Sequence, residues 1–164
     1  GRLTAAHLLG LIGAGGEEPH PQCISTITWS CARLKVRSAE LMAAVGDAAL
    51  MWLALFKPFE LANVLWGFAK LQLPHAALLC AAHDHILHHL WEFSPQTLSM
   101  VAWAFAMARS QACGGLLCTM ADVFATGLLE EGGASPVTIA NMVWALATAR
   151  ARARWEALSA IGDA

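Results

Sequence analysis

The chain has 164 residues, which is enough for one compact domain or a short array of repeats. It is 57% hydrophobic and 13% charged, and its formal net charge of −2 argues against binding nucleic acid through overall charge alone. The longest uncharged stretch, residues 132–149, holds Ser, Pro, Thr and Asn, so we expect no membrane-spanning helix.

Three residue types recur along the chain in one phase. The tryptophans are spaced by 37, 37 and 41 residues: Trp29, Trp66, Trp103 and Trp144. The prolines keep this spacing: Pro21, Pro58, Pro95 and Pro136. The aspartates follow at 37, 38 and 41: Asp47, Asp84, Asp122 and Asp163. The shared phase predicts an internal repeat of about 37 residues, lengthened by a loop insertion near residues 130–133.

Each repeat is expected to hold a first helix opened by proline, a short turn and a second helix. The predicted divisions are a half repeat at 1–18, full repeats at 19–56, 57–93 and 94–134, and a repeat at 135–164 truncated in its second helix. Ser94 and Ser135 are candidate N-caps. The first helices should end near Arg37, Pro74, Gln111 and Arg152. This predicts an all-α fold, an α-solenoid (superhelix), as a segment of a longer protein.

The first helix of each repeat is apolar around more than half of its circumference. A helix of this kind needs neighbours on several sides, and stacked repeats supply them. We therefore expect each repeated Trp to be largely buried between layers. On this interpretation, Trp66→Ala should cost ~3–5 kcal/mol of stability and Lys70→Ala should cost little.

A narrow stripe of varied residues remains on the first helices, at spacing 3, 4, 3, 4. In the second repeat it comprises Glu60, Asn63, Gly67, Lys70 and Pro74. Its middle position is always small: Ser30, Gly67, Ala104 and Ala145. A small residue lets a flat ligand approach the backbone, but it equally permits close packing between first helices, and the sequence leaves both open.

Charge is also unevenly distributed. Eight of the ten basic residues fall at the C-terminal ends of first helices: Arg33, Lys35, Arg37, Lys70, Arg109, Arg150, Arg152 and Arg154. The acidic residues lie mostly on or just after second helices. Stacked repeats would turn the basic residues into a ridge that can follow a phosphate backbone. Complementing the helix macrodipole is the alternative reason for their position.

The motif L-A-N-x-x-W-x-[FL]-A, at Leu61–Leu71 and with Ile for Leu at Ile139–Ala149, is similar to the octotricopeptide repeat. It also resembles the helical repeats of FAST-kinase-like and RAP-domain organelle proteins and of RNA-editing substrate-binding complexes. The resemblance covers about Pro21 to Asp163. The first repeat departs from the motif with Thr26 in place of Asn and the third with Met100, and no RAP-like domain is present.

This resemblance implies an α-solenoid that binds single-stranded organellar RNA in a groove lined by the first helices, with other RNA-processing proteins as further partners. It implies a mitochondrial or, alternatively, plastid location and a role in transcript processing, stability, editing or translation. The RNA-binding residues carried over or chosen from the stripe are Thr26, Arg33, Arg37, Asn63, Lys70, Gln111, Asn141, Thr148 and Arg152. Two alternatives remain: a protein-binding scaffold of armadillo or HEAT type, and a spacer within a larger RNA factor.

Catalysis and metal binding are not expected. No nucleophile motif, phosphate loop or carboxylate pair occurs, so we predict no enzyme activity and no cofactor. The segment from His83 to His89 suits zinc through His85 and His89, four residues apart, but other repeats hold unrelated residues there, which favours a His-rich helix without a metal. Five cysteines without a C-x-x-C pair predict a reduced interior. The repeated aspartates should bond between neighbouring repeats.

Overall fold

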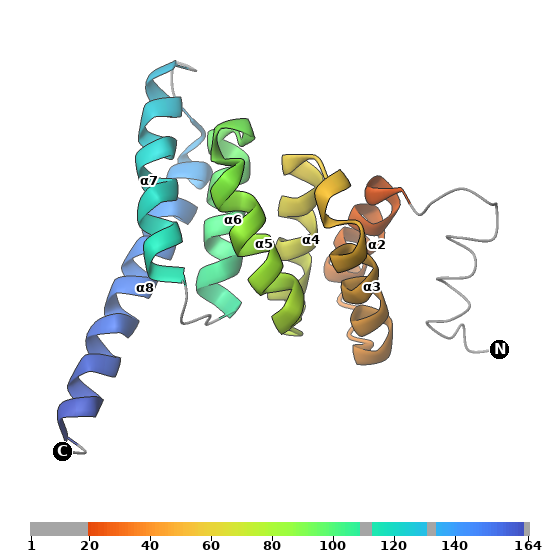
Figure 1. Ribbon diagram of the computed structural model, residues 1–164, viewed down its shortest axis with the longest axis horizontal. Helices are drawn as coiled ribbons and strands as arrows, with labels where there is room; N and C mark the ends of the chain where they lie inside the picture. Colours follow the sequence, from red (N-terminus) through yellow and green to blue (C-terminus); the bar gives the residue numbers. More distant parts are fainter. Residues whose placement is uncertain (1–19, 109–112, 131–133, 163–164) are drawn as a thin grey trace. The chain divides into compact units, whose positions relative to one another are not determined.

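The computed structural model describes residues 20–108, 113–130 and 134–162, and this part of the chain is helical without any strand (Figure 1). The elements, in order, are α2 (Pro21–Leu34), α3 (Ala39–Met51), η1 (Leu53–Leu55), α4 (Pro58–Leu71), α5 (Ala76–His88), η2 (Leu90–Glu92), α6 (Pro95–Ala108), α7 (Cys113–Glu130) and α8 (Pro136–Gly162). The expected all-α class is confirmed for the described residues. The half repeat expected at 1–18 lies outside them.

Helix starts follow the local chemistry of the sequence. The helices α2, α4, α6 and α8 each begin at the predicted proline. Ser94 and Ser135 are N-caps as expected: their Oγ atoms accept the backbone N–H groups of Thr97 at 3.3 Å and Thr138 at 3.2 Å. At α4 the Glu60 carboxylate instead accepts the N–H of Lys57 at 3.0 Å.

The chain divides into two compact units, Gly1–His88 and His89–Ala164. In the first unit α2 packs along α4, and α3 packs on both α2 and α5. Leu61, Val64 and Leu65 of α4 are buried together with Ile24 of α2 and Met42 of α3. The core therefore lies between the helices that begin at proline and the helices that follow them.

Two turns of this unit have the same backbone geometry 37 residues apart. The helices α2 and α4 both end in a left-handed residue, Lys35 and Gln72, each with φ 57°. The next helices are capped at matching positions as well. Ser38 Oγ accepts the N–H of Leu41 at 3.3 Å, and His75 Nδ1 accepts the N–H of Leu78 at 3.2 Å.

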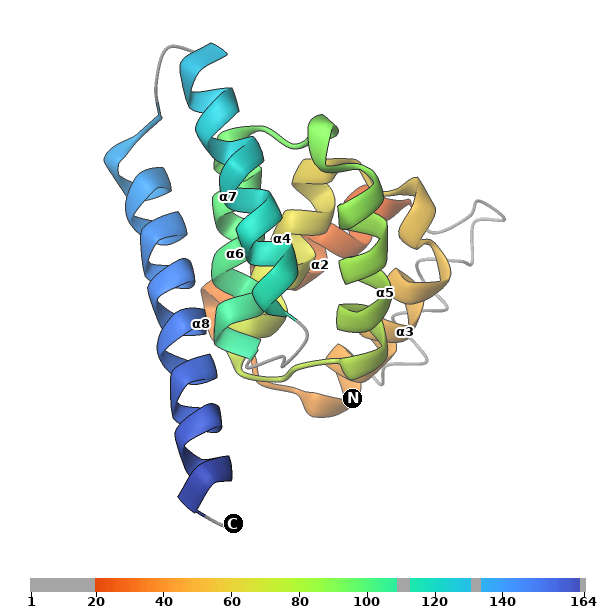
Figure 2. The ribbon, with the colours of Figure 1, turned by 60° about the vertical axis from the view of Figure 1, so that its left-hand side comes forward.

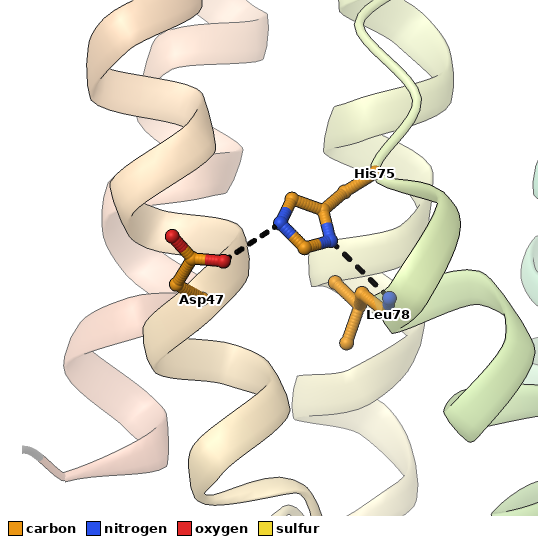
Figure 3. A network of polar contacts seen from close by, with 3 residues as sticks. All are labelled: Asp47, His75 and Leu78. Carbon is orange, nitrogen blue, oxygen red and sulfur yellow. Dashed lines mark hydrogen bonds and ion pairs between the residues drawn. The ribbon is translucent and has the colours of Figure 1, made fainter.

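His75 connects α3 to α5 (Figure 3). Because its Nδ1 accepts the Leu78 N–H, its proton sits on Nε2, which donates to Asp47 Oδ1 at 3.1 Å. The ring meets Phe68 edge-on, with centroids 6.2 Å apart. It also lies against Gly46, where a Cβ would come within 2.4 Å of His75 Cδ2. Asp47 thus bonds to a residue of the next predicted repeat, as expected, whereas the carboxylate of Asp84 contacts the adjacent His83 at 2.9 Å.

In the second unit α6 packs along α8, and α7 packs on both (Figure 2). Leu98, Val101 and Phe105 of α6 are buried, as are Met120 of α7 and Met142 of α8. The rings of Trp103 and Trp144 lie 6.3 Å apart at an interplanar angle of 34°. This pair joins α6 to α8 at the surface of the unit.

The expected burial of the repeated tryptophans is wrong for two of the four. Trp29 and Trp144 are 44% and 43% exposed, and Trp66 and Trp103 are only partly buried. The buried face of each helix is instead formed by the aliphatic residues on its other side, such as Leu61. The large cost predicted for Trp66→Ala assumed that Trp66 is fully buried. We expect a loss of that size at a fully buried residue such as Leu61, where truncation to Ala costs ~2–5 kcal/mol.

The expected helix end near Arg152 is also wrong, because α8 runs without a break to Gly162. In the first repeat the corresponding turn depends on Ser38, the N-cap of α3. The residue 115 positions later is Ala153, which has no side-chain oxygen for a cap. The surrounding Ala and Arg residues favour helix, so nothing local ends α8 there.

Candidate functional site

An open groove with a volume of about 470 Å³ lies between α2 and α4. It is lined by Gln22, Ser25, Thr26, Trp29, Phe59, Glu60 and Asn63. All of these residues except Trp29 belong to the N-terminal halves of the two helices, so α2 and α4 run in the same direction. Their C-terminal ends, which carry Arg33 and Lys70, therefore lie at the same end of the pair.

Close contact between Thr28 and Gly67 sets the width of this helix pair. A Cβ at position 67 would lie 2.5 Å from Thr28 Cγ2 and 3.1 Å from the Thr28 carbonyl oxygen. Thr28 is held in place because its Oγ1 donates to the Ile24 carbonyl at 2.7 Å. Of the two interpretations of the small middle position, close helix packing is the one that Gly67 fulfils, and the buried Ala104 and Ala145 agree with it.

Two exposed aromatic side chains flank the groove. Phe59 is 60% exposed, and Trp29 is exposed beside the Arg33 guanidinium, which lies 5.5 Å from its ring centroid. Asn63 lies between the helices and is partly buried. Aromatic faces stack on planar ligands and an amide offers both a donor and an acceptor, so the groove is suited to a flat group with polar edges.

The other polar groups of the groove are already partly engaged. Thr26 Oγ1 donates to the Gln22 carbonyl at 2.8 Å, which leaves the Thr26 oxygen as an acceptor. The Glu60 carboxylate accepts the Lys57 N–H at the N-terminus of α4. The helix macrodipole therefore partly offsets the one acidic side chain that lines this groove.

The predicted site residues are distributed over both units. Thr26 and Asn63 lie together in the groove, and Arg33, Arg37 and Lys70 are exposed at or just beyond the C-terminal ends of α2 and α4. The second unit holds two more that are partly buried on α8: Asn141 and Thr148. Gln111 and the side chain of Arg152 lie outside the described residues.

The two aromatic residues that flank the groove, Trp29 and Phe59, were not predicted from the sequence to lie there. Trp29 was assigned to the core because of its repetition, although repetition does not fix the direction in which a side chain points. Phe59 follows Pro58 at a position that holds Gln22 and Gln96 in other repeats. The available signal was an aromatic residue at a position that is polar in the first and third repeats.

The histidine segment brings no metal site together among the described residues. His83 pairs with Asp84, His88 Nδ1 contacts the Asp84 carbonyl oxygen at 2.7 Å, and His89 contacts Glu92 at 2.9 Å. Burial raises the pKa of the Cys31 thiol, which therefore forms less thiolate at neutral pH than an unperturbed cysteine. Within the described ranges, no helix is long and apolar enough to cross a bilayer.

Comparisons of the chain with models of known protein families, with curated proteins and with solved structures found no match. The class that the described residues define is therefore an all-helical protein in which neighbouring helices pack on one another. Its functional interpretation rests on the residues of the groove.

Proposed function

We propose that this chain is a segment of an α-solenoid of two-helix repeats, each of about 37 residues, and that its first helices bind single-stranded RNA. The repeat is supported by matching features one period apart. These are the proline starts of α2, α4 and α6, the left-handed ends at Lys35 and Gln72, and the caps at Ser38 and His75. A structural unit copied along the chain accounts for all three.

The groove between α2 and α4 is the observation that carries the RNA proposal. Unpaired bases present faces that stack on aromatic rings and edges that bond to amides and hydroxyls. Trp29 and Phe59 supply exposed rings, and Asn63 and Thr26 supply the polar groups beside them. A base within a duplex exposes neither its face nor its Watson–Crick edge to such a groove.

The charges next to the groove suit the RNA backbone. Arg33, Arg37 and Lys70 are exposed at one end of the helix pair, and Glu60 is tied to the start of α4. Phosphates that follow the stacked bases would lie near these cations, and binding would release counterions. The chain as a whole has a net charge of −2, so this local charge, and not the overall charge, attracts the ligand.

By the resemblance of its repeats, the RNA is an organellar transcript, in a mitochondrion or alternatively a plastid, and binding supports its processing, stability, editing or translation. In this proposal no acidic residue or histidine of the chain acts as a catalyst. The chain acts as a binding module that places a transcript for other RNA-processing proteins.

The test compares two exposed tryptophans. Trp29→Ala should weaken binding of labelled pools of short single-stranded RNA by ~1–3 kcal/mol, because it removes a stacking surface. Trp91→Ala is the matched control, since Trp91 is 74% exposed and lies on η2, outside the groove. Fluorescence anisotropy measures both, with circular dichroism to confirm folding. If Trp29→Ala and Trp91→Ala bind RNA equally well, the groove is not the RNA site, and selection of peptides by the same groove would favour the protein scaffold.

A further inference from the structure

Of the described residues that line the groove between α2 and α4, Glu60 alone is acidic. It lies on the first turn of α4, and Asn63 follows one turn later on the same face of the helix. The corresponding positions on the other helices that begin at proline hold Cys23 on α2, Thr97 on α6 and Thr138 on α8. The carboxylate is therefore a feature of this groove and not of the repeat.

The contact of Glu60 with the start of α4 leaves its carboxylate able to accept further hydrogen bonds. Its Oε2 atom accepts the Lys57 N–H at 3.0 Å, which occupies one lone pair. The two oxygens of an ionised carboxylate offer about four lone-pair positions and no donor. Because the same contact holds the side chain against the first turn of α4, Glu60 presents a pair of acceptors at a defined place in the groove.

The Watson–Crick edges of the four bases differ in what they offer to a pair of acceptors. Guanine carries two adjacent donors, N1–H and the 2-amino group, and its O6 acceptor lies on the other side of N1–H. Adenine and cytosine each present one amino group beside an acceptor nitrogen, and uracil presents one N–H between two carbonyl oxygens. A carboxylate that faces an acceptor forms no bond there and loses its hydration. Guanine is thus the base whose edge can give Glu60 two parallel, charge-assisted hydrogen bonds.

The other groups of the groove suit the same base. The amide N–H of Asn63 can donate to O6, the acceptor next to N1–H on guanine. Glu60 and Asn63 follow each other along α4, as the two donors and the acceptor follow each other along the edge of the base. Trp29 and Phe59 offer exposed rings to the face of the base, and a purine covers more of such a ring than a pyrimidine does.

We propose that the groove between α2 and α4 selects guanine in single-stranded RNA, and that the Glu60 carboxylate accepts hydrogen bonds from N1–H and the 2-amino group of the base. This inference rests on the RNA binding proposed above and adds the identity of the base. It also explains an acidic side chain in a groove for an anionic ligand. The negative charge opposes the approach of phosphates in general, and the two charge-assisted bonds offset this repulsion when the base is guanine.

The test measures the binding of the full chain to short oligouridines that carry one guanine, adenine, cytosine or inosine at the centre. Fluorescence anisotropy gives each affinity at the same salt concentration. The guanine strand should bind on the order of tenfold more tightly than the adenine and cytosine strands. Inosine keeps N1–H and O6 but lacks the 2-amino group, so the affinity of its strand should lie between those of the guanine and adenine strands.

The variant Glu60→Gln separates base selection from folding. A glutamine side chain can still accept the Lys57 N–H, so the start of α4 is kept, but its amide replaces one acceptor oxygen by a donor. The variant should lose the guanine preference and bind the other strands at least as tightly as the wild type, because a negative charge is removed. Glu40→Gln is the matched control, since Glu40 lies on the first turn of α3, outside the groove. It removes the same charge and should keep the preference, and circular dichroism confirms that both variants are folded.

The possible results distinguish guanine selection from RNA binding itself. Equal affinity for all the single strands, or a preference for another base, overturns guanine selection and leaves RNA binding intact. A guanine preference that persists in Glu60→Gln overturns the role of the carboxylate and with it the proposal. A chain that binds none of the strands overturns both this inference and the RNA binding on which it rests.

Discussion

Gly67 and Thr28 set the distance between α2 and α4, because a methyl group at position 67 would lie 2.5 Å from Thr28 Cγ2. Gly67→Ala should therefore force the two helices apart and cost ~1–3 kcal/mol, despite the higher helix propensity of Ala. Gly115→Ala on α7 is the control, since a Cβ there meets nothing within 4 Å and should stabilise by up to ~1 kcal/mol. Urea denaturation measures both, and equal stability of the two variants would contradict the close contact.

The cap at His75 should matter more for stability than the hydrogen bond of His75 to Asp47. His75→Ala removes the acceptor for the Leu78 N–H and should cost ~1 kcal/mol or more. Asp47→Ala should cost only ~0–1 kcal/mol, because the Asp47 side chain is 74% exposed. His75→Ser should recover part of the loss by reproducing the cap that Ser38 forms on α3. Thermal denaturation checks the order, and a loss for Asp47→Ala as large as for His75→Ala would refute it.

The thiols should differ in reactivity because burial raises the pKa of Cys31. At neutral pH less Cys31 is thiolate, so alkylation should be slower there than at the exposed Cys23 and Cys80. As the pH rises, Cys31 should become reactive later than these two. Peptide mapping by mass spectrometry after timed alkylation measures the rates, and unfolding in urea should make them equal. Similar rates in the folded protein would show that Cys31 is accessible.

The helix starts were predictable from the sequence because they depend on a few neighbouring residues. Proline fixes a helix start and serine caps it within a few residues, so the starts of α6 and α8 and the caps at Ser94 and Ser135 were predictable. The end of α8 was not predictable in this way. Similarity to the first repeat suggested a turn near Arg152, but the local sequence around Ala153 does not favour one.

The groove was predicted only in its polar part. Thr26 and Asn63 were expected to face a ligand, and they lie together between α2 and α4. The exposure of Trp29 depends on which face of α2 the neighbouring helices cover, and periodicity alone does not reveal this. Phe59 was missed because it lies outside the stripe of varied residues that was expected to face a ligand.

Base contacts and phosphate contacts should respond differently to mutation. Asn63→Ala should change which short RNA is preferred, at a cost of ~1–3 kcal/mol for the matched base. Lys70→Ala should weaken binding evenly across sequences and lower the slope of log affinity against log salt by about one unit. Arg33→Ala should act in the same way, with a further loss if its contact with the Trp29 ring orients that ring. Competition between short RNA pools at several salt concentrations measures both effects.

The most direct test of RNA binding by the groove is the affinity of the chain for one RNA sequence as a single strand and as a duplex, measured over a range of salt concentrations. We predict tighter binding to the single strand, because only its bases can enter between Trp29 and Phe59, and an affinity that falls as salt rises. Equal affinity for the duplex, or binding to the single strand that does not change with salt, would contradict the account.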